Sequence, residues 1–96
     1  MAKAYLEITM KIPKSKRPQA AKVYFDYRGT FLEQIEGAVS KDLLVRDKDV
    51  QVLHGFDSME HAKAYLSSEM FKNDLFTGLS PLREQDPEVR IFEVAV

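Results

Sequence analysis

The stretch that decides the fold is VQVLHGFDSMEHAKAYLSSEMF, residues 50–71. Its first seven residues are mostly apolar, which predicts a buried strand over 50–56. Asp57 follows this strand, and Glu60 stands three residues further on, a pattern typical of a helix N-terminus capped by Asp57. The stretch therefore predicts a buried strand that turns directly into a helix.

The second half of the stretch continues the helix and then interrupts it. Its apolar side chains recur every three or four residues, as expected when one face of a helix is buried. Ser67 and Ser68 interrupt this spacing, which predicts a break and a short further helix over 69–76, ended by Gly78 and Pro81. The expected buried stripe comprises Met59, Ala62, Leu66 and Met70.

The preceding part of the chain predicts a strand and a helix. Residues 4–12 alternate apolar and polar side chains, so we expect a half-buried strand that Pro13 ends, because proline cannot donate to a sheet. Residues 18–36 carry apolar side chains at helical spacing, with Pro18 in the first turn and Gly37 as the stop. The expected buried stripe comprises Ala21, Tyr24, Phe25, Phe31, Leu32 and Ile35.

The remaining strands complete a βαββαβ order. Residues 41–46 and 50–56 are separated by a short polar turn, which predicts a hairpin, and residues 88–96 predict the last strand. Right-handed crossovers turn this order into a four-stranded antiparallel sheet with both helices on one face, the ferredoxin-like arrangement of the α+β class. We expect one such domain over residues 1–96.

Composition and charge exclude several kinds of protein. The chain has no cysteine, which excludes disulfides, thiolate catalysis and cysteine-ligated metal sites. Its net charge of −1 gives no general attraction for nucleic acid or for an anionic membrane. No apolar run reaches the roughly 18 residues of a membrane span, and the N-terminus has no secretory pattern. We expect a soluble cytoplasmic protein without a nucleic-acid or membrane partner.

The face of the sheet that the helices leave open is expected to be apolar. Leu43 and Leu44 point to opposite sides of their strand, and so do Ile91 and Phe92. Soluble monomers seldom expose a patch larger than a few hundred Å2, so we expect two chains to pack these faces together as a homodimer. The alternative is that the segment 77–88 or the C-terminus folds over the face. The expected open patch comprises Tyr5, Leu44, Leu53, Phe92 and Val94.

Several motifs of the chain resemble a known family. They are GFDS at 55–58, MExA at 59–62, SSEMFK at 67–72 and GAVSKDLLV at 37–45. Together they resemble the antibiotic-biosynthesis-monooxygenase-like group of dimeric α/β-barrel proteins. The resemblance implies two ferredoxin-like sheets facing each other as a barrel, with the helices outside and a pocket in each subunit between sheet and helices. Members of this group include cofactor-independent oxygenases of quinols and polyketides, haem-degrading enzymes and proteins with no known activity.

The chain departs from the haem-degrading branch of that group. Phe56 stands where the branch has a Trp, the first strand has no Asn, and no His follows the pair Phe71-Lys72. The resemblance therefore implies no haem, and we expect no cofactor.

His54 is the candidate catalytic residue. It lies on the third strand in phase with Val50, Val52 and Phe56, a position where a histidine is commonly a hydrogen-bonded core residue. In the functional interpretation, its ordinary pKa of about 6.5 suits a general base. It would take a proton from a quinol or polyphenol-like substrate, and the resulting carbanion-like anion would meet oxygen directly.

An aromatic layer on the helices is the candidate ligand-binding surface. Plain core packing also explains this layer. In the functional interpretation it forms a flat pocket for an aromatic ligand, with tyrosyl hydroxyls to orient the ligand and methionine as an adaptable wall. The candidate ligand-binding residues are Met10, Tyr24, Phe31, Phe56, Tyr65 and Phe71.

Two further groups of polar residues have structural and functional interpretations. His61 lies on the second helix beside Glu60, and we expect it to be exposed to solvent. No spacing of His, Asp and Glu predicts a metal site. Lys14, Lys16 and Arg17 precede a helix N-terminus, where they form either a solvated loop or an anion site.

Two classes of function remain open. The first is a cofactor-independent monooxygenase acting on a small aromatic molecule, and the second is a non-catalytic dimeric ligand-binding or structural protein. A third class, RNA recognition, uses the same order of elements but needs a basic, aromatic and glycine-rich third strand. The strand VQVLHGF has one aromatic residue and neither Lys nor Arg, which argues against that class.

Overall fold

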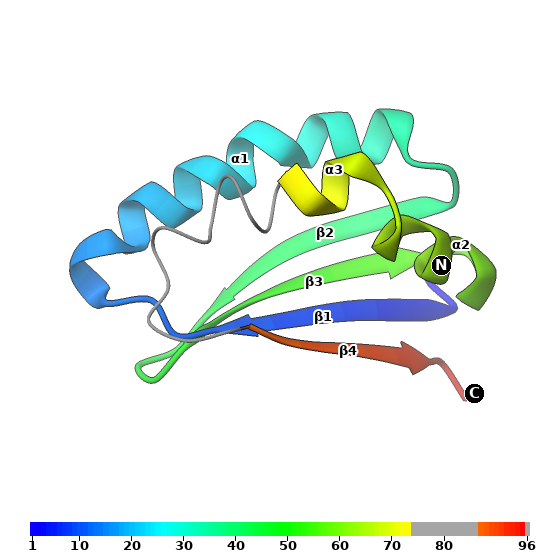
Figure 1. Ribbon diagram of the computed structural model, residues 1–96. Coiled ribbons are helices and arrows are strands. Elements are labelled where there is room, and N and C mark those ends of the chain that lie inside the picture. Colours follow the sequence, from blue (N-terminus) through cyan, green and yellow to red (C-terminus); the bar gives the residue numbers. More distant parts are fainter. Residues whose placement is uncertain (74–86, 96) are drawn as a thin grey trace.

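The structure is a computed structural model that describes residues 1–73 and 87–95 of the chain. It confirms the predicted order of strands and helices (Figure 1). The elements are β1 (Ala4–Met10), the 3-10 helix η1 (Lys14–Lys16), α1 (Arg17–Gln34), β2 (Ala38–Val45), β3 (Val50–Phe56), α2 (Met59–Leu66), α3 (Glu69–Lys72) and β4 (Glu88–Glu93).

The four strands form one antiparallel sheet in the order β2-β3-β1-β4. Figure 1 shows α1, α2 and α3 on one side of this sheet, and the described residues place no helix on the other side. This is the ferredoxin-like arrangement, so the predicted fold class is confirmed.

β1 shows how the alternating sequence separates the two faces of the sheet. Leu6, Ile8 and Met10 are at most 2% exposed and belong to the core beneath the helices, whereas Tyr5 and Thr9 are half-buried on the open face. The register carries this division to neighbouring strands. The core comprises Ala4, Leu6, Ile8, Met10, Ile12, Ala20, Phe31, Val50, Val52, Phe56, Ala62, Tyr65 and Phe71.

α1 runs without interruption from Arg17 to Gln34, but its buried stripe differs from the expected one. Ala20 and Phe31 are buried, whereas Phe25 is 76% exposed, so the prediction that Phe25 belongs to the stripe is wrong. Phe25 precedes Phe31 by six residues, which places it about 120° away around the helix. Its ring packs edge-on against the neighbouring ring of Tyr24, with centroids 6.2 Å apart.

The N-terminus of α2 is capped one residue later than the sequence suggests. The Ser58 hydroxyl accepts the backbone N–H of His61 at 3.2 Å, so the prediction that Asp57 is the cap is wrong. The Asp57 carboxylate is instead bound to the His61 side chain, with Oδ1 and Nδ1 2.5 Å apart. The Asp57 carboxylate thus bonds to a side chain of α2, and the Ser58 hydroxyl caps the helix.

The predicted break at Ser67 and Ser68 is confirmed. The Ser68 hydroxyl accepts the backbone N–H of Phe71 at 3.1 Å and caps α3. The later part of the short helix predicted over 69–76, with its ends at Gly78 and Pro81, lies outside the described residues.

Three predicted strand boundaries shift. β1 ends at Met10 rather than at residue 12, although Ile12 is still buried. β2 begins at Ala38 rather than at residue 41, because a bulge between Ala38 and Ser40 lets the strand pair with β3 as far as Phe56. β4 ends at Glu93, within the strand predicted over 88–96.

The predicted end of the first helix at Gly37 is too late: α1 ends at Gln34, and Ile35 already has an extended backbone, whereas Gly37 lies in the turn that follows. Its φ is +83°, a left-handed conformation that glycine adopts without steric cost. The position is also crowded, because a Cβ there would lie 2.3 Å from Nδ1 of His61 and 2.6 Å from Oδ1 of Asp57. Gly37 therefore allows the turn between α1 and β2 and lets this turn approach α2 closely.

Candidate functional site

His54 lies at the centre of the sheet on the face that the helices cover. It stands opposite Leu6 of β1 on one side and Lys41 of β2 on the other. Its side chain has no exposed surface. The candidate catalytic residue is therefore an interior group in this structure.

Aromatic rings surround His54. Its ring centroid is 5.1 Å from that of Phe31 and 5.3 Å from that of Tyr65. Phe56 lies 5.7 Å from both Phe31 and Tyr65, and Phe71 lies 5.5 Å from Tyr65. These five residues come from α1, β3, α2 and α3. We call them the aromatic cluster.

The hydrogen bond of His54 determines its tautomer. Its Nδ1 lies 3.2 Å from the carbonyl oxygen of Leu6. A carbonyl oxygen only accepts, so Nδ1 carries the proton and donates it. Nε2 then holds a lone pair, and it has no hydrogen-bond partner among the residues that the structure describes.

Burial keeps the His54 imidazole neutral. Loss of hydration lowers its pKa from 6.5 to about 3, the positive charge of Lys41 acts in the same direction, and the bond to Leu6 opposes both. The expectation of a base with a pKa near 6.5 therefore does not hold. At neutral pH, Nε2 is a hydrogen-bond acceptor with little tendency to keep a proton.

Lys41 is a buried charged residue that the sequence analysis missed. It is 1% exposed, and its ammonium lies 5.5 Å from the ring centroid of Phe31 and 5.7 Å from that of Tyr27. Both are cation–π distances. A signal was present in the sequence, because Lys41 alternates in phase with the inward-facing Leu43 and stands opposite His54.

The two other candidate ligand-binding residues lie apart from the aromatic cluster. Met10 is buried and pairs with Val50. It lies four residues further along β1 than Leu6, which is the residue opposite His54. Tyr24 is half-buried, and its hydroxyl donates to the backbone carbonyl of Lys41 at 2.6 Å. The structure thus brings together four of the six candidates, Phe31, Phe56, Tyr65 and Phe71, around His54.

His61 is more engaged than the sequence suggests. Its side chain is 32% exposed, its Nδ1 bonds to Asp57, and its Nε2 lies 3.6 Å from Oε1 of Glu36. Asp57 is the main cause that raises the pKa of His61, and His61 is the main cause that lowers the pKa of Asp57. The described residues contain no cluster of three or more possible metal ligands.

The basic segment before α1 is largely used within the chain. The Arg17 guanidinium donates to the backbone carbonyls of Ile12 and Asp47, at 3.2 and 2.8 Å. The Lys14 ammonium lies 3.6 Å from the Asp47 carboxylate. These contacts join the start of α1 to the β2–β3 turn and favour the interpretation of this segment as a structural loop.

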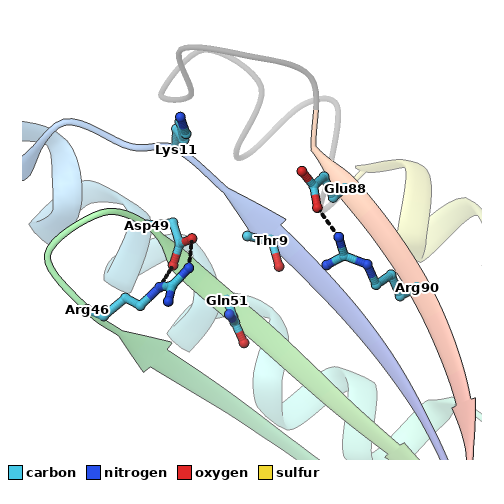
Figure 2. Close-up of a pocket in the computed structure, with 7 residues that line it drawn as sticks. All are labelled: Thr9, Lys11, Arg46, Asp49, Gln51, Glu88 and Arg90. Carbon is cyan, nitrogen blue, oxygen red and sulfur yellow. Dashed lines mark hydrogen bonds and ion pairs between the residues drawn. The ribbon is translucent and has the colours of Figure 1, made fainter.

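A polar pocket of about 210 Å3 lies on the opposite, open face of the sheet. Figure 2 shows two ion pairs in it, Arg46 with Asp49 and Arg90 with Glu88. A single Gln or Thr on a strand carries no recognisable pattern, so this pocket was not predictable from the sequence. Its lining residues are Thr9, Lys11, Arg46, Asp49, Gln51, Glu88 and Arg90.

The fold places the chain beside antibiotic-biosynthesis-monooxygenase-like proteins. A proposed antibiotic biosynthesis monooxygenase from Caulobacter crescentus has a TM-score of 0.81 and 17% identity, over 99% of this chain and 92% of that one. A protein of unknown function from Nitrosomonas europaea has a TM-score of 0.80 and 14% identity, over 100% and 92%. The resemblance to this group is therefore confirmed at the level of the fold.

A haem-degrading protein shares the fold as well. MhuD from Mycobacterium tuberculosis, whose structure holds two haems in its active site, has a TM-score of 0.71 and 18% identity, over 96% of each chain. No protein-family model and no curated protein matches the chain. Within the described residues, no helix combines the length and the apolar character that crossing a membrane requires.

Proposed function

We propose that the protein binds a small hydroxylated aromatic molecule between its sheet and its helices, and that it does so as a homodimer. The observation that supports the binding site is Nε2 of His54, a buried acceptor without a partner among the described residues. Leaving such an atom unpaired costs about 1–3 kcal/mol. A ligand hydroxyl that donates to Nε2 would recover this free energy.

The surroundings of Nε2 favour an aromatic ligand with a polar edge. Phe31 and Tyr65 present their rings to His54 and offer the stacking and edge contacts that aromatic compounds prefer. The ammonium of Lys41 favours negative charge density, as on a phenol oxygen that shares its proton. Because His54 has no exposed surface, the ligand must move at least one of these rings on binding.

The pKa of His54 favours binding over proton abstraction. Transfer of a phenolic proton to Nε2 would create an imidazolium in the interior beside the charge of Lys41, and this state is unfavourable for a group with a pKa of about 3. The ligand hydroxyl therefore donates a hydrogen bond and keeps its proton. Non-catalytic ligand binding is thus the function that the geometry supports best.

A cofactor-independent monooxygenase is the second candidate. The observation that favours it is the shared fold with a proposed antibiotic biosynthesis monooxygenase. In that function His54 would accept the phenolic proton, and the substrate anion would react with oxygen. The ligand would then have to offset the cost of the buried imidazolium.

The described residues do not fit haem. The His54 ring is enclosed by the rings of Phe31 and Tyr65, and His61 is bonded to Asp57 on the protein surface. A haem-binding site needs a histidine or another ligand that faces a cavity large enough for the macrocycle. We therefore derive no role for haem.

The homodimer is proposed from the open face of the sheet. Leu44 and Phe92 are each 45% exposed and Val94 is 41% exposed, with the half-buried Tyr5 and Leu53 between them. Tyr5 stands directly opposite Phe92 on the neighbouring strand. A second copy of the chain is the occupant we favour, because self-complementary apolar faces close into a two-fold pair.

The ligand site is tested with 2-naphthol, an aromatic alcohol whose fluorescence reports binding. We expect saturable binding, together with a change in the NMR resonance of His54 Nε2. In His54→Leu the affinity should fall about tenfold, the equivalent of one hydrogen bond. His61→Gln is the matched control and should bind as the parent does. Absence of saturable binding, or equal affinity in His54→Leu, would refute the proposed site.

The two candidate functions are separated with a naphthoquinol and an oxygen electrode. Binding without oxygen uptake above the rate in buffer supports the non-catalytic function. Uptake that requires the protein and is lost in His54→Leu supports the monooxygenase instead.

A further inference from the structure

The polar pocket lies on the face of the sheet that is turned away from His54. Thr9 and Gln51 stand opposite each other on β1 and β3, and Glu88 of β4 pairs with Thr9 from the other side. In the view of Figure 2 the two ion pairs stand to the left and right, with Thr9 and Gln51 between them and Lys11 above. The pocket is thus separate from the site proposed for an aromatic ligand.

One side of the pocket is held by a closed ion pair. Arg46 contacts both carboxylate oxygens of Asp49, at 2.6 and 2.7 Å, and the Asp49 side chain is only 8% exposed. The bond from Arg46 is the main cause that lowers the pKa of Asp49, so this carboxylate remains ionised. Its negative charge is therefore matched within the pocket wall.

The opposite side is matched in the same way. Arg90 bonds to Glu88 and also lies 3.5 Å from Glu7. The Thr9 hydroxyl donates to the Glu7 carboxylate at 2.5 Å. The carboxylates of Glu7 and Glu88 on this side thus already have hydrogen-bond donors within the chain.

Two hydrogen-bond donors that line the pocket have no such partner. The Lys11 ammonium and the Gln51 side-chain amide make no hydrogen bond or ion pair with any residue that the structure describes. The charge of Lys11 also helps to lower the pKa of Asp49. The carboxylates of the pocket already have hydrogen-bond donors within the chain, whereas the Lys11 ammonium and the Gln51 amide do not contact an acceptor of the described residues. Such a pocket favours a ligand that supplies hydrogen-bond acceptors and one negative charge.

We propose that this pocket binds a small oxyanion, a carboxylate or a phosphate, through Lys11 and the Gln51 amide. The volume of about 210 Å3 admits a small organic acid. The remaining N–H groups of Arg46 and Arg90 add donors at the two sides. This function goes beyond the aromatic site, and it would give the protein a second ligand on the opposite face of the sheet.

The pocket adjoins one side of the contact proposed for the dimer, because Gln51 of the pocket pairs with Leu44 of that contact. Tyr5 of β1 pairs with Phe92 of β4, and Thr9 pairs with Glu88 on the same two strands. The two pairs are four residues apart, which corresponds to roughly 13 Å along a strand. A second copy that covers Leu44 and Phe92 would therefore lie beside the pocket on the β2 side. Lys11 and Gln51, which are proposed to hold the anion, both belong to one chain.

The proposal is tested by titrating the whole protein with inorganic phosphate and, separately, with acetate. Amide resonances are followed by NMR at constant ionic strength, with sodium chloride as the balancing salt. We expect saturable shifts that centre on Thr9, Gln51 and Arg90 with at least one of the two anions. The anion that binds more tightly identifies the ligand class.

Two variants and a control make the test specific. Lys11→Gln should weaken binding at least fivefold, and Gln51→Leu should weaken it severalfold. Lys63→Gln removes an exposed lysine on α2 and should leave binding unchanged. Shifts that stay linear in anion concentration, or that persist in Lys11→Gln, would overturn the proposal.

Discussion

His54 shows most directly how burial changes the chemistry of a single residue. The sequence places it correctly on the inward face of a strand, but the pKa follows from the surroundings in three dimensions. Complete burial beside Lys41 holds the imidazole neutral, and the carbonyl of Leu6 selects which nitrogen carries the proton. The residue is consequently an oriented acceptor in an apolar interior.

This burial predicts an acid-labile fold. The folded pKa of His54 is lowered from 6.5 to about 3, so the unfolded chain binds the proton first as the pH falls. Stability from this group is complete above pH 6.5 and is lost toward pH 3, by an amount on the order of 5 kcal/mol. Denaturant unfolding at pH 7 and pH 4 measures it. In His54→Leu the loss between these two values should be smaller. An equal loss in both proteins would contradict the assigned state of His54.

His61 predicts the opposite dependence on pH. Asp57 raises its pKa above 6.5, so its contribution to stability is complete below 6.5 and is lost as the pH rises through the raised value. The pKa of Asp57 is lowered below 3.8, so its contribution is lost only at still lower pH. The pair therefore stabilises the fold most between about pH 4 and 6.5. His61→Gln should destabilise the protein at pH 5.5 and have less effect at pH 9, as urea midpoints at both values would show.

At the scale of elements, the two glycines of the α1 region provide a matched pair. Gly29 lies inside α1, and nothing lies within 4 Å of the position of an added Cβ. Gly37 lies in the turn after α1 at φ +83°, where an added Cβ meets His61 and Asp57. The same substitution should therefore have opposite effects at the two positions.

The expected changes can be measured by chemical denaturation. Gly29→Ala should raise the free energy of unfolding by about 0.5–1 kcal/mol, because alanine loses less backbone entropy in a helix. Gly37→Ala should lower it by more than about 1 kcal/mol through strain and contact with His61. Stabilisation by Gly37→Ala would show that the turn adopts another conformation.

Element order and the two faces of the sheet were predictable because they follow from periodicity. Period-two alternation in β1 and Ser67-Ser68 after α2 each leave a local signal in the sequence. The cap of α2 was misplaced because Asp57 and Ser58 are both good caps, and only the position of the His61 side chain decides between them. Phe25 was misplaced because an apolar residue on a long helix need not face the sheet.

The candidate site was predictable only in part. Alternation identifies the inward residues of β3, and the ring-bearing positions of the helices follow from helical spacing. Lys41 was missed because a lysine on a strand is ordinarily exposed, and its burial depends on rings that α1 brings from elsewhere in the chain. The polar pocket was missed because its residues come from three strands and a turn, and their proximity is a property of the sheet order.

At the scale of the whole molecule, the open apolar face predicts the state of association. Sedimentation equilibrium at micromolar concentration should give the mass of two chains. Phe92→Glu places a charge in the proposed contact and should give one chain with the circular dichroism of the parent. Phe25→Glu changes an even more exposed aromatic residue on the helix side and should remain a dimer. A monomeric parent protein would refute the proposed dimer.

The way in which α1 is fastened to the sheet restricts how the interior can open. Tyr24 and Arg28, one turn apart on α1, both donate to the backbone carbonyl of Lys41, at 2.6 and 3.2 Å. Rolling the helix aside would break both bonds at once. Tyr65 and Phe71, in contrast, belong to helices of eight and four residues. The passage of any guest molecule to His54 should therefore run past these short helices, and their amides should exchange with deuterium before those of α1.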